Sequence, residues 1–138
     1  MKQGIAKNER LRQQSVIDSL FVRSCPALLA YGFRFSWHAL KPPQESNCVV
    51  LFVSSKKKLK RAVDRNRRKR LLRELYRLNK QALVQYASLN NQYFAISINY
   101  VGSAELDFNL HTPLFQKAIQ KLILELKKNN SNPIHPAH

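Results

Sequence analysis

The chain has 138 residues, 44% of them hydrophobic, which suits one compact domain with a core of ordinary size. Its formal net charge is +16, from 24 Lys and Arg against 8 Asp and Glu residues. This imbalance predicts a polyanionic partner and favours nucleic acid over a membrane surface. No apolar run approaches the roughly 20 residues of a spanning helix. Residues 1–20 also lack the apolar region of a secretory signal, so we expect a cytoplasmic protein that does not bind membranes.

The N-terminal third predicts a helix followed by a strand. Apolar residues in residues 9–22 recur at spacings of mostly three to five, which favours a short amphipathic helix. Residues 33–39 alternate strictly, as in a half-buried strand. One face of this strand carries Phe33, Phe35, Trp37 and Ala39, and the other carries Arg34, Ser36 and His38. A further short strand near residues 27–31 is compatible with the sequence.

The next elements follow a turn rich in proline. Residues 41–47, KPPQESN, cannot continue a β-ladder. Residues 48–53, CVVLFV, form a continuous apolar run, which predicts a strand buried on both faces. Residues 93–100 alternate again and predict another strand. Thr112 followed by Pro113 resembles a helix start, and one stripe of the predicted helix consists of Leu114, Ala118, Leu122 and Leu126.

Residues 56–80 hold more than half of the chain's Lys and Arg residues. A helical wheel at 100° per residue places most of this charge on one face and apolar side chains on the opposite face. The predicted apolar face consists of Leu71, Leu75, Leu78, Ala82 and Tyr86. The predicted basic face, which we call the cationic ridge, consists of Asn66, Lys69, Arg70, Arg73, Arg77 and Lys80. One long helix is therefore expected to pack through its apolar face and to present this ridge to phosphates.

A merely solvated basic face is the alternative for this segment. Between Lys56 and Arg73 there are eleven basic residues and one acid, Asp64. Like charges four residues apart destabilise a helix by a few tenths of a kcal/mol, so Arg73 with either Lys69 or Arg77 carries a cost when no anion is bound. This pattern favours nucleic-acid binding. Arginine suits bidentate phosphate contacts, and Phe21, Phe35 and Trp37 could stack on bases, although alternation favours a core role for the latter two.

Within the basic segment, residues 62–74 read AVDRNRRKRLLRE. This run resembles the R-N-R-x-K-R-x-x-R-E signature of the protein component of bacterial ribonuclease P, and it matches at every position. The flanks are similar too. An amphipathic helix ends in Leu20 and Phe21, a strand ends in Val-Ser before the lysines, and the strand YFAISINY follows the basic helix. The resemblance covers roughly residues 8–128.

The resemblance implies a single domain of the α/β class, an α+β sandwich with a central mixed sheet like the second domain of ribosomal protein S5. It implies a left-handed βαβ crossover between two parallel strands, whereas general topology rules favour a right-handed one. In this organisation residues 1–7 are a flexible N-terminus, residues 8–128 form the domain and residues 129–138 are a disordered tail.

The resemblance also implies a function and its residues. The family's enzyme is an endoribonuclease that removes the 5′ leader from precursor tRNA, and its RNA subunit carries the chemistry. The positions expected to bind the catalytic RNA are Arg65, Asn66, Arg67, Lys69, Arg70, Arg73 and Arg77. Those expected to bind the single-stranded leader are Ile17, Phe21, Trp37, Lys56 and Lys57.

No catalytic residue, metal site or cofactor is expected on the chain itself. None of its eight acidic residues is paired closely enough to hold two catalytic metals, so Mg²⁺ is expected through the RNA subunit. The expected partners are the catalytic RNA and the precursor leader, not DNA. Two alternatives remain, namely a general RNA-binding or ribosomal-type protein and a self-sufficient nuclease that uses His38 or His111.

Overall fold

The computed structural model describes residues 14–22, 25–41, 44, 46–54 and 59–130. These residues form one domain with a mixed four-stranded sheet, which confirms the predicted fold class. The elements in chain order are α1 (Gln14–Ser19), β1 (Ala27–Ala30), β2 (Phe33–Ala39), β3 (Cys48–Val53), α2 (Ala62–Asn79), α3 (Gln81–Leu89), β4 (Phe94–Tyr100) and α4 (Phe108–Asn130). The strands predicted at residues 33–39 and 48–53 are confirmed, and the short strand near residues 27–31 is present.

The sheet has the strand order β1-β2-β4-β3. β2 pairs with β1 and β4 in antiparallel fashion, whereas β3 and β4 are parallel neighbours. The connection from β3 to β4 contains α2 and α3, so the basic helix lies in the crossover between two parallel strands. The left-handed sense of this crossover stays a prediction.

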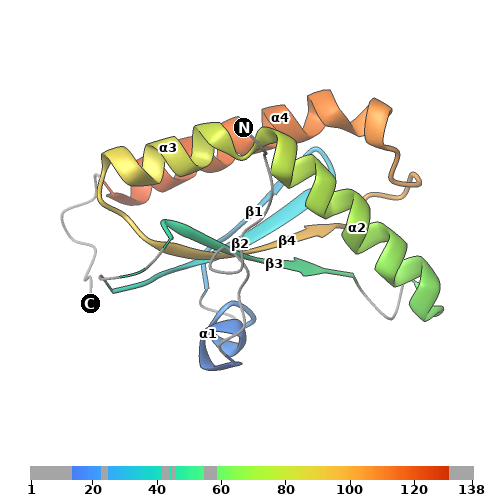
Figure 1. The fold of residues 1–138 in the computed structure, drawn as a ribbon, viewed down its shortest axis with the longest axis horizontal. Coiled ribbons are helices and arrows are strands. Elements are labelled where there is room, and N and C mark those ends of the chain that lie inside the picture. Colours follow the sequence, from blue (N-terminus) through green and yellow to red (C-terminus); the bar gives the residue numbers. More distant parts are fainter. Residues whose placement is uncertain (1–13, 23–24, 42–43, 45, 55–58, 131–138) are drawn as a thin grey trace.

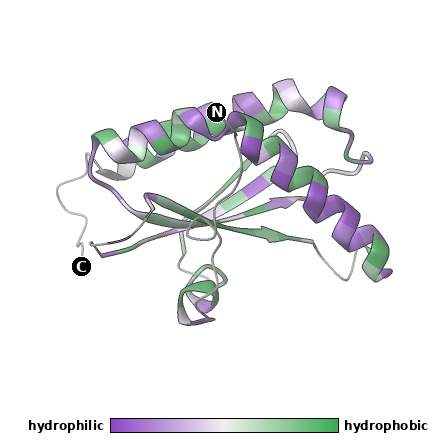
Figure 2. Cartoon of the chain, in the orientation of Figure 1, coloured by the Kyte–Doolittle hydropathy of each residue, from purple (hydrophilic) through white to green (hydrophobic). Residues whose placement is uncertain are grey.

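The helices divide unequally between the two faces of the sheet. α2, α3 and α4 cover one face, and α1 lies on the opposite side (Figure 1). Alternation in β2 and β4 points Phe33, Phe35, Ile96 and Ile98 toward the three helices, where all four are fully buried. We call this side the core face and the α1 side the second face. The strands are largely hydrophobic and α2 is largely hydrophilic (Figure 2).

The β1–β2 hairpin turns through two residues, Tyr31 and Gly32, which both have positive φ angles, 54° and 85°. Two consecutive positive φ values match the twist of the flanking strands and are typical of tight hairpins. A Cβ atom added to Gly32 would lie 2.9 Å from the Tyr100 ring. Glycine is therefore favoured there by both backbone conformation and space.

The prediction that residues 48–53 are buried on both faces is wrong. β3 pairs only with β4 and forms one edge of the sheet. Cys48 and Val50 are buried on the core face, whereas Val49 and Leu51, which point to the second face, are half-buried. Apolar content alone could not distinguish this arrangement from full burial, because the second face is covered only in part.

The single long helix predicted across the basic segment is two helices. α2 ends at Asn79, and α3 begins at Gln81 in a different direction (Figure 1). Asn79 Nδ2 donates to the Leu75 carbonyl at 2.8 Å, and Asn79 Oδ1 accepts from Gln116 of α4 at 2.9 Å. A side chain that bonds the carbonyl four residues earlier competes with the helical ladder, and here it does so where α2 stops.

The apolar face of these helices is also rotated from the predicted one. Leu75 and Tyr86 are buried as predicted and Leu71 is partly buried, but Leu78 and Ala82 are exposed. The wheel missed the contribution of Tyr76, which has 0% exposure and packs edge-on against Phe52. The full buried set is Leu72, Leu75, Tyr76, Leu83, Tyr86 and Ala87.

The start of α4 was predicted too late. The helix begins at Phe108, so Pro113 lies inside it and Thr112 is not its cap. Asp107 has the capping role, because its Oδ2 atom accepts a hydrogen bond of 2.8 Å from the Leu110 backbone N–H. The predicted apolar stripe is otherwise confirmed, with Ala118, Leu122 and Leu126 buried and Leu114 half-buried.

Replacing Asp107 by Ala is expected to lower the free energy of unfolding by about 0.5–2 kcal/mol, because it leaves an N–H group of the first turn without its acceptor. The measurement is urea unfolding followed by circular dichroism. Asp107→Ser keeps a capping oxygen and serves as the control, with most of the stability retained. Equal loss in both variants would contradict the capping role.

Several predictions fall partly or wholly outside the described residues. They concern the helix before Gln14, the N-terminal segment 1–7, Lys56 and Lys57, and the tail after Asn130. The domain boundary predicted at residue 128 lies within α4, which extends to Asn130.

Candidate nucleic-acid interface

The arginine motif occupies the first half of α2, on the side turned away from the sheet. Asn66, Arg67 and Arg70 are exposed there, while Leu72 and Leu75 on the opposite side are fully buried. Arg73 is also exposed, but it lies on the flank of the helix, with its guanidinium 5.8 Å from the centre of the Phe52 ring of β3. Burial of these leucines fixes the rotation of the helix and thereby the direction of the cations. The structure thus leaves four of the seven predicted RNA-binding residues accessible, three of them on one side of α2.

The other three predicted residues are less accessible. Arg65 is half-buried, and its Nη1 atom donates to the carbonyls of Leu59 and Lys60 at 2.9 and 2.8 Å. Lys69 is half-buried. Arg77 donates from Nε and Nη2 to Glu74 Oε2, at 3.1 and 2.7 Å. Arg65 therefore holds the segment that leads into α2, and Arg77 has its charge compensated by Glu74.

The N-terminus of α2 adds favourable electrostatics to this surface. Its N-cap residue, Arg61, makes no side-chain capping hydrogen bond. The first N–H groups of a helix carry a partial positive charge and attract anions such as phosphate. In the first turn, Asp64 Oδ2 lies 3.7 Å from Arg61 Nε. This ion pair is largely exposed to solvent and contributes little to stability.

Sequence reasoning missed the role of Arg68 within the motif. Its guanidinium is half-buried, lies 5.3 Å from the centre of the Tyr100 ring and donates to the Tyr100 carbonyl at a long 3.4 Å. Arg68 thus connects α2 to the end of β4. The signature has an unspecified residue at this position, so only the packing of α2 against β4 could identify it.

Phe21 and Ile17 belong to the segment on the second face of the sheet. Phe21, which follows α1, exposes 53% of its surface, and Ile17 is half-buried. Leu20 lies between them in the chain and is 1% exposed. Leu20 therefore anchors this segment and leaves the Phe21 ring accessible to a ligand.

Polar side chains of β2 and β4 line the second face beside this segment. Arg34 is exposed and is the register partner of Asn99, and Ser36 hydrogen-bonds across the strands to Ser97. Within the described part of the chain, Asn99 Oδ1 is buried and has no hydrogen-bond partner. The alternation of β2 predicted that Arg34 lies on the face opposite the aromatic side chains. It did not predict that α1 lies on the same side of the sheet as Arg34.

The structure separates Trp37 from Ile17 and Phe21, which are predicted to bind the leader with it. Trp37 points to the core face and is only 5% exposed, within the same cluster as Phe35 and Ile96. A side chain in this position cannot reach a strand bound on the α1 side. The alternation of residues 33–39 correctly placed Trp37 on the same face as Phe33 and Phe35. For this residue, alternation was a better guide than its suitability for base stacking.

Replacing Trp37 by Ala is expected to cost about 3–5 kcal/mol of folding free energy, since it opens a cavity in the core. Urea unfolding measures this cost. Phe21→Ala serves as the comparison and should be close to neutral, because most of its ring is already exposed. A stable Trp37→Ala protein that has lost only RNA affinity would contradict the core placement.

The described residues do not assemble the groups of a protein nuclease. His38 is exposed on the second face, whereas His111 is buried in α4 with its Nε2 atom 3.2 Å from the Tyr100 hydroxyl. Burial raises the pKa of the Cys25 thiol, outweighing a hydrogen bond with the Trp37 backbone and the nearby Arg34 charge, which lower it. Cys25 therefore stays protonated at neutral pH and is a poor nucleophile.

Membrane spanning requires a helix that is both long and apolar. Within the described ranges, none of the helices meets both conditions.

Comparisons with known proteins agree with the motif on α2. The family model for ribonuclease P matches residues 5–123. The ribonuclease P protein component of Porphyromonas gingivalis is 31% identical over 126 residues, 91% of this chain and 88% of that protein. The protein of the same name from Chlorobium phaeobacteroides is 33% identical over 106 residues, 72% of this chain and 73% of its own length. The protein of the same name from Chlorobaculum tepidum is 38% identical over 86 residues, which are 59% of this chain and 54% of that protein.

Proposed function

This chain belongs to the ribonuclease P protein family, and we propose that it is the subunit that docks on a catalytic RNA and holds the 5′ leader of precursor tRNA. The observation that carries the proposal is the ordered arginine motif on the outward side of α2. Its exposed cations, Arg67, Arg70 and Arg73, would neutralise phosphates of the catalytic RNA and release counterions.

The leader would bind on the second face of the sheet. Phe21 offers an accessible ring for base stacking, and Ile17 offers an apolar contact beside it. Arg34 supplies a cation for the backbone. A leader held here would raise the affinity for precursor over mature tRNA.

In this proposal the hydrolysis itself belongs to the RNA subunit and its Mg²⁺ ions. Among the described residues, no group of three or more His, Cys, Asp or Glu side chains is arranged to hold a metal ion. The protein would act by orienting the two RNAs and by neutralising charge where they approach each other. Its place of action would be the cytoplasm, where bacterial precursor tRNA is processed.

The test combines purified protein and precursor tRNA, with and without a bacterial ribonuclease P RNA, at low magnesium concentration. We expect no cleavage by the protein alone and faster, tighter processing when protein is added to the RNA. Cleavage without RNA would instead identify a protein nuclease. If the protein bound RNA but did not stimulate cleavage by the ribonuclease P RNA, the result would indicate a general RNA-binding protein.

A further inference from the structure

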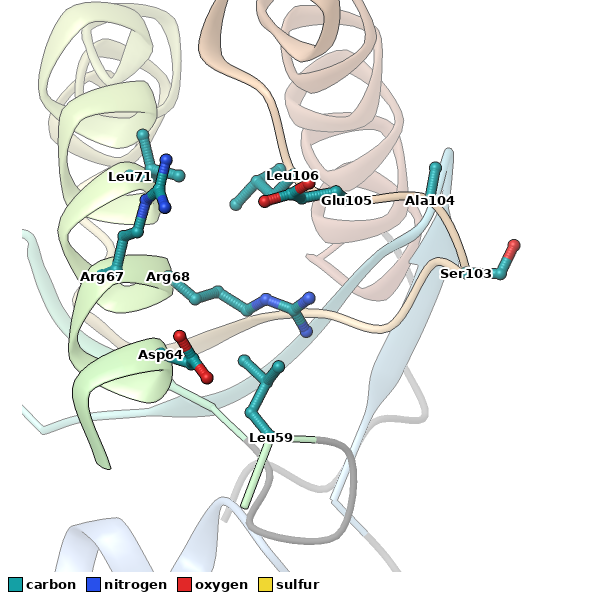
Figure 3. A pocket seen from close by; sticks show the side chains of 9 residues that line it. All are labelled: Leu59, Asp64, Arg67, Arg68, Leu71, Ser103, Ala104, Glu105 and Leu106. Carbon is teal, nitrogen blue, oxygen red and sulfur yellow. The ribbon is translucent and has the colours of Figure 1, made fainter. Parts of the chain in front are cut away.

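A cavity of about 380 Å³ lies between the first half of α2 and the segment that connects β4 to α4. Its volume falls within the roughly 300–1,000 Å³ of ordinary ligand pockets, so it has room for one nucleoside. Figure 3 shows Arg68 extending from α2 between Leu59 on one side and Glu105 with Leu106 on the other. The lining residues are Leu59, Asp64, Arg67, Arg68, Leu71, Ser103, Ala104, Glu105 and Leu106.

Both walls of the cavity are held in place by packing. Arg68 is positioned by the ring and the carbonyl of Tyr100, and the Tyr100 hydroxyl is bonded in turn to His111. On the other wall, Leu106 is 5% exposed and belongs to the hydrophobic core. Asp107 follows it directly and caps α4. A pocket with fixed walls binds at a lower entropic cost than a flexible one.

The charges in the cavity differ from those on the rest of the basic surface. Two of the chain's eight acidic residues, Asp64 and Glu105, line it together with Arg67 and Arg68. Two carboxylates would repel a phosphate, whereas the exposed side of α2 offers Arg67 and Arg70, and the acid on that side, Glu74, is paired with Arg77. The cavity therefore suits a group that both donates and accepts hydrogen bonds and has flat apolar faces, which is the chemistry of a nucleobase.

We propose that this cavity binds one unpaired guanine of the catalytic RNA, an inference that rests on the proposed function. Guanine carries N–H donors at N1 and N2 for the carboxylates of Asp64 and Glu105. It also carries acceptors at O6 and N7, which arginine recognises with two hydrogen bonds. Adenine and the pyrimidines do not combine two adjacent donors with such an acceptor pair. Leu59, Leu71 and Leu106 supply the apolar contacts for the ring.

The position of the cavity points to the catalytic RNA rather than to the leader. Arg67 belongs both to the cavity lining and to the exposed arginine motif, so a base inserted here would be continuous with the phosphates bound along α2. α1, which contains Ile17 and ends two residues before Phe21, lies on the other side of the sheet (Figure 1). An RNA strand bound on that side would have to pass around the sheet to reach the cavity.

The experiment probes the complex of the full-length protein with a bacterial ribonuclease P RNA and precursor tRNA. Kethoxal modifies N1 and N2 of unpaired guanines, the atoms that the carboxylates would cover, and hydroxyl radicals report backbone contacts in the same sample. The variant is Asp64→Asn combined with Glu105→Gln, which keeps the side-chain shapes. The matched control is Glu125→Gln, which removes a carboxylate paired with Lys128 on α4.

We expect one guanine of the catalytic RNA to be protected by the wild-type protein and by Glu125→Gln. In the double variant this guanine should become about tenfold more reactive toward kethoxal, because a good bidentate base contact contributes a preference of about that size. The backbone footprint should persist. Removal of two negative charges should by itself strengthen RNA binding. Loss of the guanine footprint alongside equal or tighter binding therefore separates base recognition from general attraction.

Three results would overturn the inference while leaving the proposed function intact. They are a backbone footprint without any protected guanine, a guanine protected equally in the double variant, and protection that falls on the precursor tRNA instead. Absence of the backbone footprint with wild-type protein would refute the docking function itself, and with it the inference that rests on it.

Discussion

Replacing Arg67 and Arg70 by Ala is expected to weaken binding to ribonuclease P RNA and to flatten its dependence on salt. Both side chains are exposed on the outward side of α2 and make no contact that the fold requires. Removing one phosphate contact should reduce the slope of log affinity against log salt concentration by roughly 0.7 to 0.9. The slope for the double variant should therefore be smaller by about 1.5, measured by filter binding between roughly 50 and 200 mM salt.

The matched control removes two exposed cations from α4, as Lys117→Ala with Lys127→Ala. It changes the net charge by the same amount, so it reports the effect of long-range attraction alone. We expect a clearly smaller change in slope for this control. Equal changes in both double variants would show that α2 has no specific phosphate contacts.

Arg65 calls for a separate variant because it has a structural role. Its guanidinium bonds two carbonyls of the segment before α2, so Arg65→Ala should lower the melting temperature as well as RNA affinity. Thermal unfolding without RNA measures the first effect. An unchanged melting temperature would mean that these two hydrogen bonds do not stabilise the domain.

Replacing Phe21 by Ala is expected to reduce discrimination between precursor and mature tRNA while leaving affinity for the catalytic RNA nearly unchanged. The ring is 53% exposed, so its removal opens no core cavity. Stacking of one base on an aromatic ring contributes about 1–3 kcal/mol, which corresponds to a fall of roughly fivefold to 150-fold in preference for the precursor. The measurement is the ratio of the two dissociation constants in the assembled ribonucleoprotein.

Leu124→Ala is the control for this experiment. Leu124 is similarly exposed, at 56%, but it belongs to α4, which lies on the side of the sheet opposite α1. It should leave the ratio unchanged. A tRNA with a leader shortened by one nucleotide at a time would locate the base that contacts Phe21. Equal weakening for precursor and mature tRNA would remove Phe21 from the leader site.

Local patterns predicted the strands well because their alternation records burial directly. The bounds of β2 and β3 follow from the sequence, and so does the shared face of Phe33 and Phe35, but the pairing of Phe35 with Ile98 is an observation that alternation alone does not predict. The start of α4 was missed because a Thr-Pro pair resembles a helix start as much as Asp107 does. Only the observed hydrogen bonds distinguish the two.

The candidate site was predictable where residue order carries the information. The arginine motif identified the exposed cations of α2, but the state of each one depends on its neighbours. Arg77 is paired with Glu74 and Arg68 is held by Tyr100, and only the second of these contacts spans distant parts of the chain. No periodicity in the sequence could have predicted that one.

Composition and residue order were enough to predict a polyanionic partner, the apolar face of β2 and the family to which the chain belongs. These properties depend on charge, alternation and residue order, all of which are local. Which aromatic rings are accessible depends instead on the tertiary structure, because Trp37 of β2 is packed in the core whereas Phe21 follows α1 and stays 53% exposed. The cavity at Arg68 also depends on the tertiary structure, since Asp64 and Glu105 line it together only when α2 packs beside the β4–α4 connection.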